Sequence, residues 1–272
     1  MPNARLVSAA VMLPFVIGGI LYLPTAGVAL AVALVMGAGL WEWGRMIPLH
    51  STAARLAYPA AVIALMALLW VMPLNRVINP LLLLGFTWWL AALYWLAHPG
   101  FGLQPTPAVR LIKGIAGVLV MLPAWSAFIT LHGRADHGPV ICLVLLVLVW
   151  LADSGAYFAG RRWGHTRLAP LISPGKTREG VLGGILASVV FILIAGYWYS
   201  RSVGWTLTLA LVSILVVMFS IVGDLLESLM KRQAGLKDSG DVIPGHGGIL
   251  DRIDSLTAAA PLFLLGLLWF KL

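Results

Sequence analysis

Long apolar stretches separated by short polar connections dominate the chain. A helix that spans a bilayer needs about 20 mostly apolar residues. Nine stretches meet this requirement, at residues 6–23, 25–43, 56–73, 80–97, 114–131, 138–159, 181–200, 204–224 and 255–271. Backbone groups in lipid must pair with one another, so helix is expected for every span. The pattern predicts an all-α, polytopic membrane protein. The first two stretches meet at Leu23 and Pro24, which allows one re-entrant hairpin as an alternative.

Composition supports a membrane protein of one domain. Apolar residues make up 61% of the 272 residues and charged residues 10%, whereas soluble proteins carry about 25% charged residues. The net charge of +8 comes from cations placed between apolar segments, which argues against a nucleic-acid surface. Connections this short leave no room for a separate soluble domain. We therefore expect a single membrane domain over 1–272, with N-terminal helices in 1–150 and catalytic helices in 151–272.

The cations also predict an orientation. With nine spans, 14 of the 18 Lys and Arg residues fall on the side of the N-terminus, and the other side holds only Arg76, Arg134, Arg201 and Lys271. Cytoplasmic connections carry the excess of Lys and Arg, so the N-terminus is expected inside and the C-terminus outside. The two longest polar connections, 160–180 and 225–254, then face the cytoplasm. The compact size indicates a bacterial inner membrane.

Acidic residues are concentrated in the second half of the chain. Eight of the ten carboxylates lie between Asp153 and Asp254. Asp153 directly follows the apolar run VLVWLA, where an unpaired charge costs about 2.5–3.5 kcal/mol. Its carboxylate is expected to face a cavity near Tyr157. The alternative is an ion pair with Arg161 or Arg162.

The connection GRRWGHTRLAPLISPGKTREG carries donors suited to phosphate. Its PGKT does not complete the phosphate-binding GxxxxGK[ST] loop, because Pro170 stands where the first glycine is needed. Ser173, Lys176, Thr177 and Arg178 still lie at the start of the next helix, whose N-terminus favours anions. The segment predicts a polyphosphate site. The alternative is a basic anchor that touches lipid headgroups.

Two further segments direct acids toward one connection. In VGDLLESLMKR, Asp224, Glu227, Ser228 and Lys231 share one helix face. The stretch KDSGDVIPGHGG then breaks the helix, and ILDRIDS opens the last span with Asp251, Asp254 and Ser255.

Carboxylate oxygens suit Mg²⁺, which takes one or two of them and leaves other positions to water and substrate phosphates. The nearby glycines let backbone approach a ligand closely. Glu227 and Lys231 alternatively form a simple i,i+4 pair. Alternatively, Asp153, Asp224 and Asp251 could line the ion path of a transporter.

The stretch SLMKRQAGLKDSGDVIPGHGGILDRID, 228–254, resembles the signature of the phosphatidate cytidylyltransferase (CDP-diacylglycerol synthase) family. DSGAYFAGRRWG and ISPGKTREGVLGG resemble the same family, although His165 stands where a basic residue is expected. These motifs cover about residues 153–255, and over 1–150 only hydropathy and length are similar.

The resemblance implies that CTP and phosphatidic acid react to CDP-diacylglycerol and pyrophosphate, with Mg²⁺ and room for a second cation. It also implies contact with membrane lipids and a homodimer. A nearer alternative is a lipid-alcohol kinase that uses CTP. The metal ligands would be Asp224, Asp251 and Asp254. The groups expected to bind substrate phosphates, by side chain or backbone, are Ser173, Lys176, Arg178, Ser228, Lys231, Arg232, His246, Gly247, Gly248 and Arg252.

Overall fold

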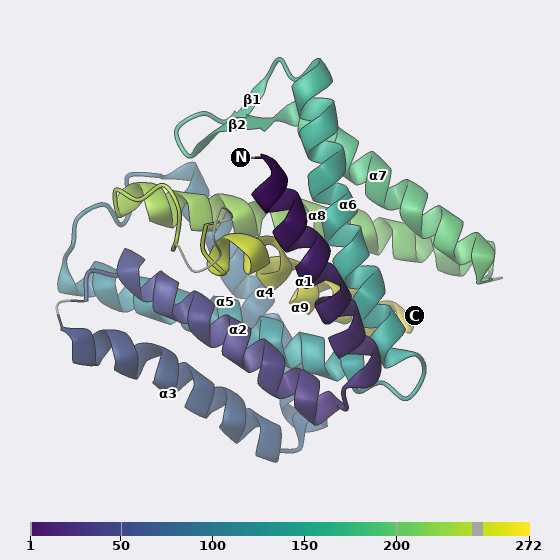
Figure 1. Ribbon diagram of the computed structural model, residues 1–272, viewed down its shortest axis with the longest axis horizontal. Helices are drawn as coiled ribbons and strands as arrows, with labels where there is room; N and C mark the ends of the chain where they lie inside the picture. The colour runs from purple at the N-terminus through teal and green to yellow at the C-terminus, as the bar shows by residue number, and fades with distance from the viewer. Residues whose placement is uncertain (1, 50, 200, 241–246) are drawn as a thin grey trace.

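The computed structural model describes residues 2–49, 51–199, 201–240 and 247–272, with side chains from residue 12 onward. Over these residues the chain forms nine helices and one hairpin (Figure 1). The helices are α1 (Pro2–Tyr22), α2 (Thr25–Met46), α3 (Thr52–Val71), α4 (Leu74–Ala97), α5 (Pro107–His132), α6 (Gly138–Trp163), α7 (Arg178–Trp198), α8 (Val203–Gln233) and α9 (Leu250–Phe270). Hydroxyl side chains cap several of them: Ser51 on α3, Thr106 on α5 and Ser202 on α8.

Eight of these helices, α2 to α9, are long and apolar enough to cross a membrane. The expectation of a polytopic α-helical membrane protein is therefore confirmed. The described apolar part of α1 is the shorter stretch Met12–Tyr22, so a ninth span stays a prediction. Helix α8 continues to Gln233, about two turns beyond the predicted apolar span, because its polar C-terminal face packs inside the protein.

A short antiparallel hairpin interrupts the otherwise helical architecture. Strand β1 (Arg167–Ala169) pairs with β2 (Ser173–Thr177), with Arg167 opposite Thr177. The prediction of an all-α fold missed it, because strands this short, with Pro174 and Gly175 inside β2, carry no alternating pattern. Ile172 anchors the hairpin: its side chain is buried, and its carbonyl accepts a long hydrogen bond of 3.5 Å from Arg232 Nε.

Helices α6 and α7 pack against each other through small residues. The glycine stripe of Gly180, Gly184 and Ser188 lies buried along α7. Ser188 Oγ donates to Gly184 O at 2.9 Å and contacts Leu148 O of α6 at 3.4 Å. A methyl group added at Gly184 would lie 2.7 Å from Ala152 O. The stripe therefore serves packing within the protein.

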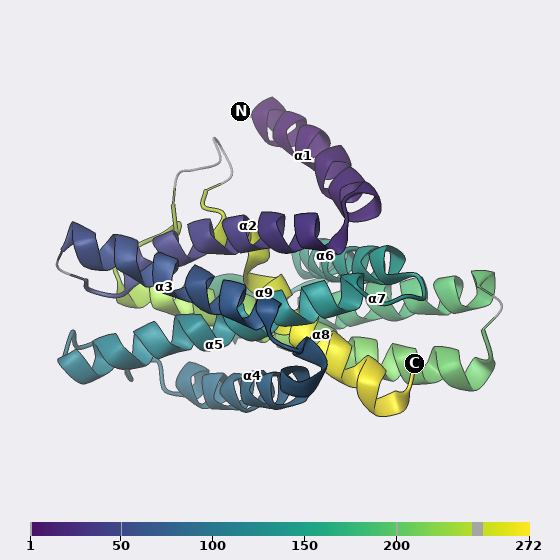
Figure 2. The ribbon, with the colours of Figure 1, turned by 90° about the horizontal axis from the view of Figure 1, so that it is seen from below.

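Hydrogen bonds join the connections between helices into two groups, one at each end of the bundle, and successive connections belong to opposite groups. At one end Arg45 donates to Ser239 O, and Gln233 donates to Pro99 O and Phe101 O. At the other, Arg134 donates to Leu272 O, and a His132 ring nitrogen lies 2.9 Å from Ile20 O. This grouping is the one that alternating spans require. Figure 2 shows α1 tilted away from the layer formed by α2, α3 and α5, and α1 packs mainly against α6.

Candidate active site

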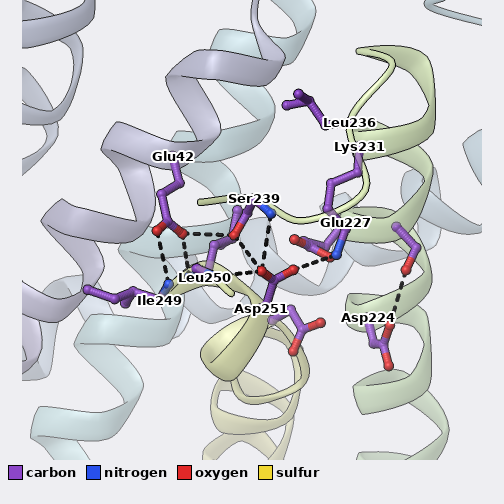
Figure 3. A network of polar contacts seen from close by, with 12 residues as sticks. Glu42, Asp224, Glu227, Lys231, Leu236, Ser239, Ile249, Leu250 and Asp251 are labelled. Carbon is purple, nitrogen blue, oxygen red and sulfur yellow. Dashed lines mark hydrogen bonds and ion pairs between the residues drawn. The ribbon is translucent and has the colours of Figure 1, made fainter. Parts of the chain in front are cut away.

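The end of α8 and the start of α9 form a polar cluster inside an apolar bundle. The two helices pack closely at Gly223, where an added methyl group would lie 2.6 Å from Asp254 O. This approach brings the acidic face of α8 beside the first turn of α9, and Figure 3 shows Asp224, Glu227, Lys231 and Asp251 together. The prediction that acids from both helix ends converge on one connection is confirmed.

Lys231 lies between two carboxylates. Its Nζ is 2.5 Å from Glu227 Oε2 and 2.5 Å from Asp251 Oδ1. The predicted i,i+4 pair between Lys231 and Glu227 is therefore present, and Asp251 of α9 is a second partner of the same ammonium group. Lys231 and Glu227 are both buried, with 9% and 2% of their surfaces exposed. A buried charge is tolerated when an opposite charge compensates it, and here one ammonium faces two carboxylates.

Asp251 accepts hydrogen bonds at both of its carboxylate oxygens. Its Oδ2 accepts from Gly248 N at 2.8 Å, from Ser239 N at 3.1 Å and from Ser239 Oγ at 2.9 Å. Its Oδ1 holds Lys231. Asp251 therefore fixes the loop that precedes α9, and any further ligand at Oδ1 would have to displace Lys231.

Asp224 lies in a more open environment. Lys176, carried on β2, places its Nζ 2.5 Å from Asp224 Oδ2, with the two side chains 25% and 31% exposed. Ser228 Oγ donates weakly to Asp224 Oδ1 at 3.3 Å. The hairpin thus brings the PGKT segment onto α8, which joins two motifs that lie about 50 residues apart.

Two more carboxylates, those of Asp153 and Asp254, interact through their charge with the ion pair of Lys176 and Asp224. Asp153 is exposed on α6 and lies close enough to Asp224 and Lys176 for their charges to interact. Asp254 interacts with the same two groups. Arg161 donates to Tyr157 Oη at 3.1 Å. Among the described residues no ion pair joins Asp153 to Arg161 or Arg162, and a role for Asp153 in a cavity stays a prediction.

Sequence reasoning missed a further member of the cluster, Glu42 on α2. Its side chain is 1% exposed and accepts hydrogen bonds from Ile249 N, Leu250 N and Ser239 Oγ (Figure 3). One signal was available: Glu42 is an acid inside an apolar span, and such acids usually have a functional role.

Two glycines of the signature permit close packing in the loop. Gly247 has a φ of 80°, which glycine adopts at no steric cost. At Gly248 an added methyl group would collide with Ser239 Oγ and the Glu42 carboxylate. These glycines allow close backbone approach within the protein, and close approach to a ligand stays a prediction. His246 lies outside the described residues.

The other predicted phosphate-binding groups surround the hairpin. Arg232 Nη1 donates to Leu236 O at 3.4 Å, in addition to its bond to Ile172. Thr177 Oγ1 is buried and caps α7 by accepting from Gly180 N at 3.1 Å. Ser173 is half-buried and Arg178 exposed at the start of α7. Arg252 is exposed on the first turn of α9, next to the partly buried Asp251.

The charges of the open group suit a divalent cation. Lys176 Nζ pairs with Asp224, and Asp153 and Asp254 lie close enough for their charges to interact with that pair, so carboxylates outnumber the ammonium group. Among the described residues, no three His, Cys, Asp or Glu side chains converge as ready-made metal ligands. Mg²⁺ needs only one or two carboxylates, because water and phosphates fill its other positions. The donor set therefore fits Mg²⁺ bound together with a phosphate substrate.

Comparison with known proteins identifies the class to which this fold and cluster belong. The model of the cytidylyltransferase family matches residues 3–270, so the chain belongs to that family. The match includes the first half, where the motifs gave no support.

Individual relatives carry a more specific name. The chain is 43% identical to the phosphatidate cytidylyltransferase of Pseudomonas aeruginosa, over 99% of this chain and 97% of the relative. It is 34% identical to the Haemophilus influenzae protein of the same name, over 97% of both chains. Identity to the Synechocystis phosphatidate cytidylyltransferase is 35%, over 96% of this chain and 95% of the relative.

Proposed function

We propose that the protein transfers the cytidylyl group of CTP to phosphatidic acid, which gives CDP-diacylglycerol and pyrophosphate. The observation that carries this proposal is the ion pair between Lys176 and Asp224, because it brings a phosphate-type donor segment onto an acidic helix face. Family membership and the names of the relatives support the same reaction.

The chemistry requires little from a general base. An oxygen of the phosphatidate phosphomonoester attacks the α-phosphorus of CTP, the bond from that phosphorus to the bridging oxygen breaks, and pyrophosphate leaves. A phosphomonoester has a second pKa of about 6, so the nucleophile is already largely a dianion near pH 7. Catalysis then depends on position and on neutralisation of charge.

The lysines of the cluster are suited to exchange partners. Lys176 and Lys231 each hold carboxylates in the structure, and phosphate oxygens can replace these acceptors when substrate binds. Arg178, Arg232 and Arg252 lie on the hairpin side and the first turn of α9, where they would hold the phosphates of CTP and the departing pyrophosphate. Ser173, Ser228, Gly247 and Gly248 would provide hydrogen-bond donors to the same oxygens.

Asp224 and Asp254, with Asp251 after release of Lys231, are the residues that would hold Mg²⁺ and a second cation. The bound cation would supply positive charge against phosphate oxygens that become more negative during transfer. The carboxylates themselves orient Lys176 and Lys231 and keep those ammonium groups in the cluster.

The cluster lies at the end of the bundle that carries most of the cations. We place this end at the cytoplasmic face of a bacterial inner membrane, with the C-terminus outside, because CTP is a cytosolic substrate and the Lys and Arg bias favours that orientation. A homodimer is part of the same proposal.

The test uses detergent-solubilised protein supplied with CTP, Mg²⁺ and phosphatidic acid. Release of pyrophosphate together with a CDP-lipid supports the proposal. Formation of CDP with a lipid alcohol as acceptor, and no pyrophosphate, would identify a kinase instead. Ion flux in liposomes with neither product would identify a transporter.

A further inference from the structure

The carboxylate of Glu42 connects the N-terminal helices to the loop that opens α9. Its Oε1 accepts from Ile249 N at 3.0 Å and its Oε2 from Leu250 N at 2.8 Å. These two N–H groups belong to the start of α9, where no intrahelical acceptor is present. Ile249 itself offers no side-chain cap. A residue about 200 positions away in the sequence thus caps the helix that carries Asp251 and Asp254.

Ser239 links Glu42 to Asp251. Its Oγ lies 2.8 Å from Glu42 Oε2 and 2.9 Å from Asp251 Oδ2, so one hydroxyl proton serves two carboxylates. The backbone of Ser239 is held as well, since its N–H donates to Asp251 Oδ2 and its carbonyl accepts from Arg45 Nη1 at 3.2 Å. Two side chains of helix α2, Glu42 and Arg45, therefore form hydrogen bonds with Ser239.

The loop fits closely around the Glu42 carboxylate. A methyl group added at Gly240 or at Gly248 would collide with it. Such a fit leaves the Glu42 carboxylate little room to rotate, because densely packed interiors contain few voids. The chain of contacts continues from Asp251 to Lys231 and Glu227 on α8.

We propose that Glu42 is a positioning residue for the transfer reaction: it fixes Ser239 and the start of α9, and through them the orientation of Asp251 and Lys231. This inference rests on the proposed function. It assigns to the N-terminal half a direct part in the geometry of the site, which the signature motifs place wholly in the second half.

The first variant is Glu42→Gln, which keeps the size of the side chain but replaces one acceptor oxygen by an NH₂ group. That group faces a backbone N–H at Ile249 or Leu250 in either orientation of the amide. Displacement of a catalytic group by about 1 Å can cost about 10²-fold in rate. We expect kcat to fall by about that factor, with the KM values for CTP and phosphatidic acid within about threefold of the wild type. Asp136→Asn, which removes an exposed carboxylate from the loop between α5 and α6, should retain wild-type kcat.

The second variant is Ser239→Ala, which removes the link between the two carboxylates and is a small enough change to test the proposal even if Glu42→Gln fails to insert. It should lower kcat as well. Because both residues act through one contact, the double variant should lose no more than the more damaging single variant. Losses that multiply, or a wild-type kcat in Ser239→Ala, would overturn the proposal.

Hydrogen–deuterium exchange provides a readout that does not depend on activity. In Glu42→Gln the amides of peptides covering 247–251 should exchange faster than in the wild type, while those of α6 and α7 stay unchanged. Unchanged exchange at 247–251 would overturn the positioning role. Failure of the wild type itself to make a CDP-lipid would instead count against the proposed function.

Discussion

At the scale of residues, two aspartates of similar sequence context have different environments. Asp251 accepts at both oxygens from the backbone, a serine and a lysine. Among the described residues, Asp224 is held by an ion pair with Lys176 and a weak hydrogen bond from Ser228. Asp224 is therefore free to exchange its partner for a cation or phosphate complex, whereas Asp251 also maintains the loop.

This difference predicts different losses in two variants. Asp224→Asn should lose at least about 10²-fold in kcat, with a melting temperature in detergent close to that of the wild type. Asp251→Asn should lose activity and also about 1–3 kcal/mol of stability, because an amide cannot accept from all the donors that the carboxylate holds. Full activity in Asp224→Asn would refute its assignment as a metal ligand.

At the scale of elements, close backbone contacts set the positions of the polar groups. The glycines of α7 allow contact with α6, and Gly223 allows contact between α8 and α9. The long apolar stretches of the sequence predicted these helices, but no local pattern predicted the hairpin that brings Lys176 to Asp224. Pairing of β1 with β2 depends on its docking by Ile172, which is a tertiary contact.

Matched glycine substitutions test the role of the α6–α7 contact. In Gly184→Ala the new methyl group would lie 2.7 Å from Ala152 O, and overpacking of this kind costs about 1–3 kcal/mol. In Gly114→Ala of α5 nothing lies within 4 Å of the added atom, so helix propensity should favour the variant by about 0.5–1 kcal/mol. Melting temperatures in detergent should move in opposite directions. A lower melting temperature in both would argue against a specific contact.

At the scale of the whole molecule, the bundle places the polar cluster at one end. The sequence could predict the spans and the two acidic faces because each depends on residues close together in the chain. It could not predict Glu42 as a partner of Ser239 and Leu250, because that contact joins α2 to α9 and depends on the packing of the bundle. The same limit applies to Lys176 and Asp224.

The orientation of the molecule can be tested with introduced cysteines. The native Cys142 is buried and gives little background. Leu171→Cys, at the exposed tip of the hairpin, should react with an impermeant maleimide only from the cytoplasmic side. Ala135→Cys, between α5 and α6, should react only from the outside. The reverse pattern would place the polar cluster at the outer leaflet.

The most direct test of the central claim follows the fate of labelled phosphorus in CTP. Purified protein receives phosphatidic acid, Mg²⁺ and CTP labelled at either the α- or the γ-phosphorus, and lipid is then separated from water-soluble products. We predict that the α-label enters the lipid and the γ-label leaves as pyrophosphate. Entry of the γ-label into lipid, or retention of both labels in CTP, would contradict cytidylyl transfer at this site.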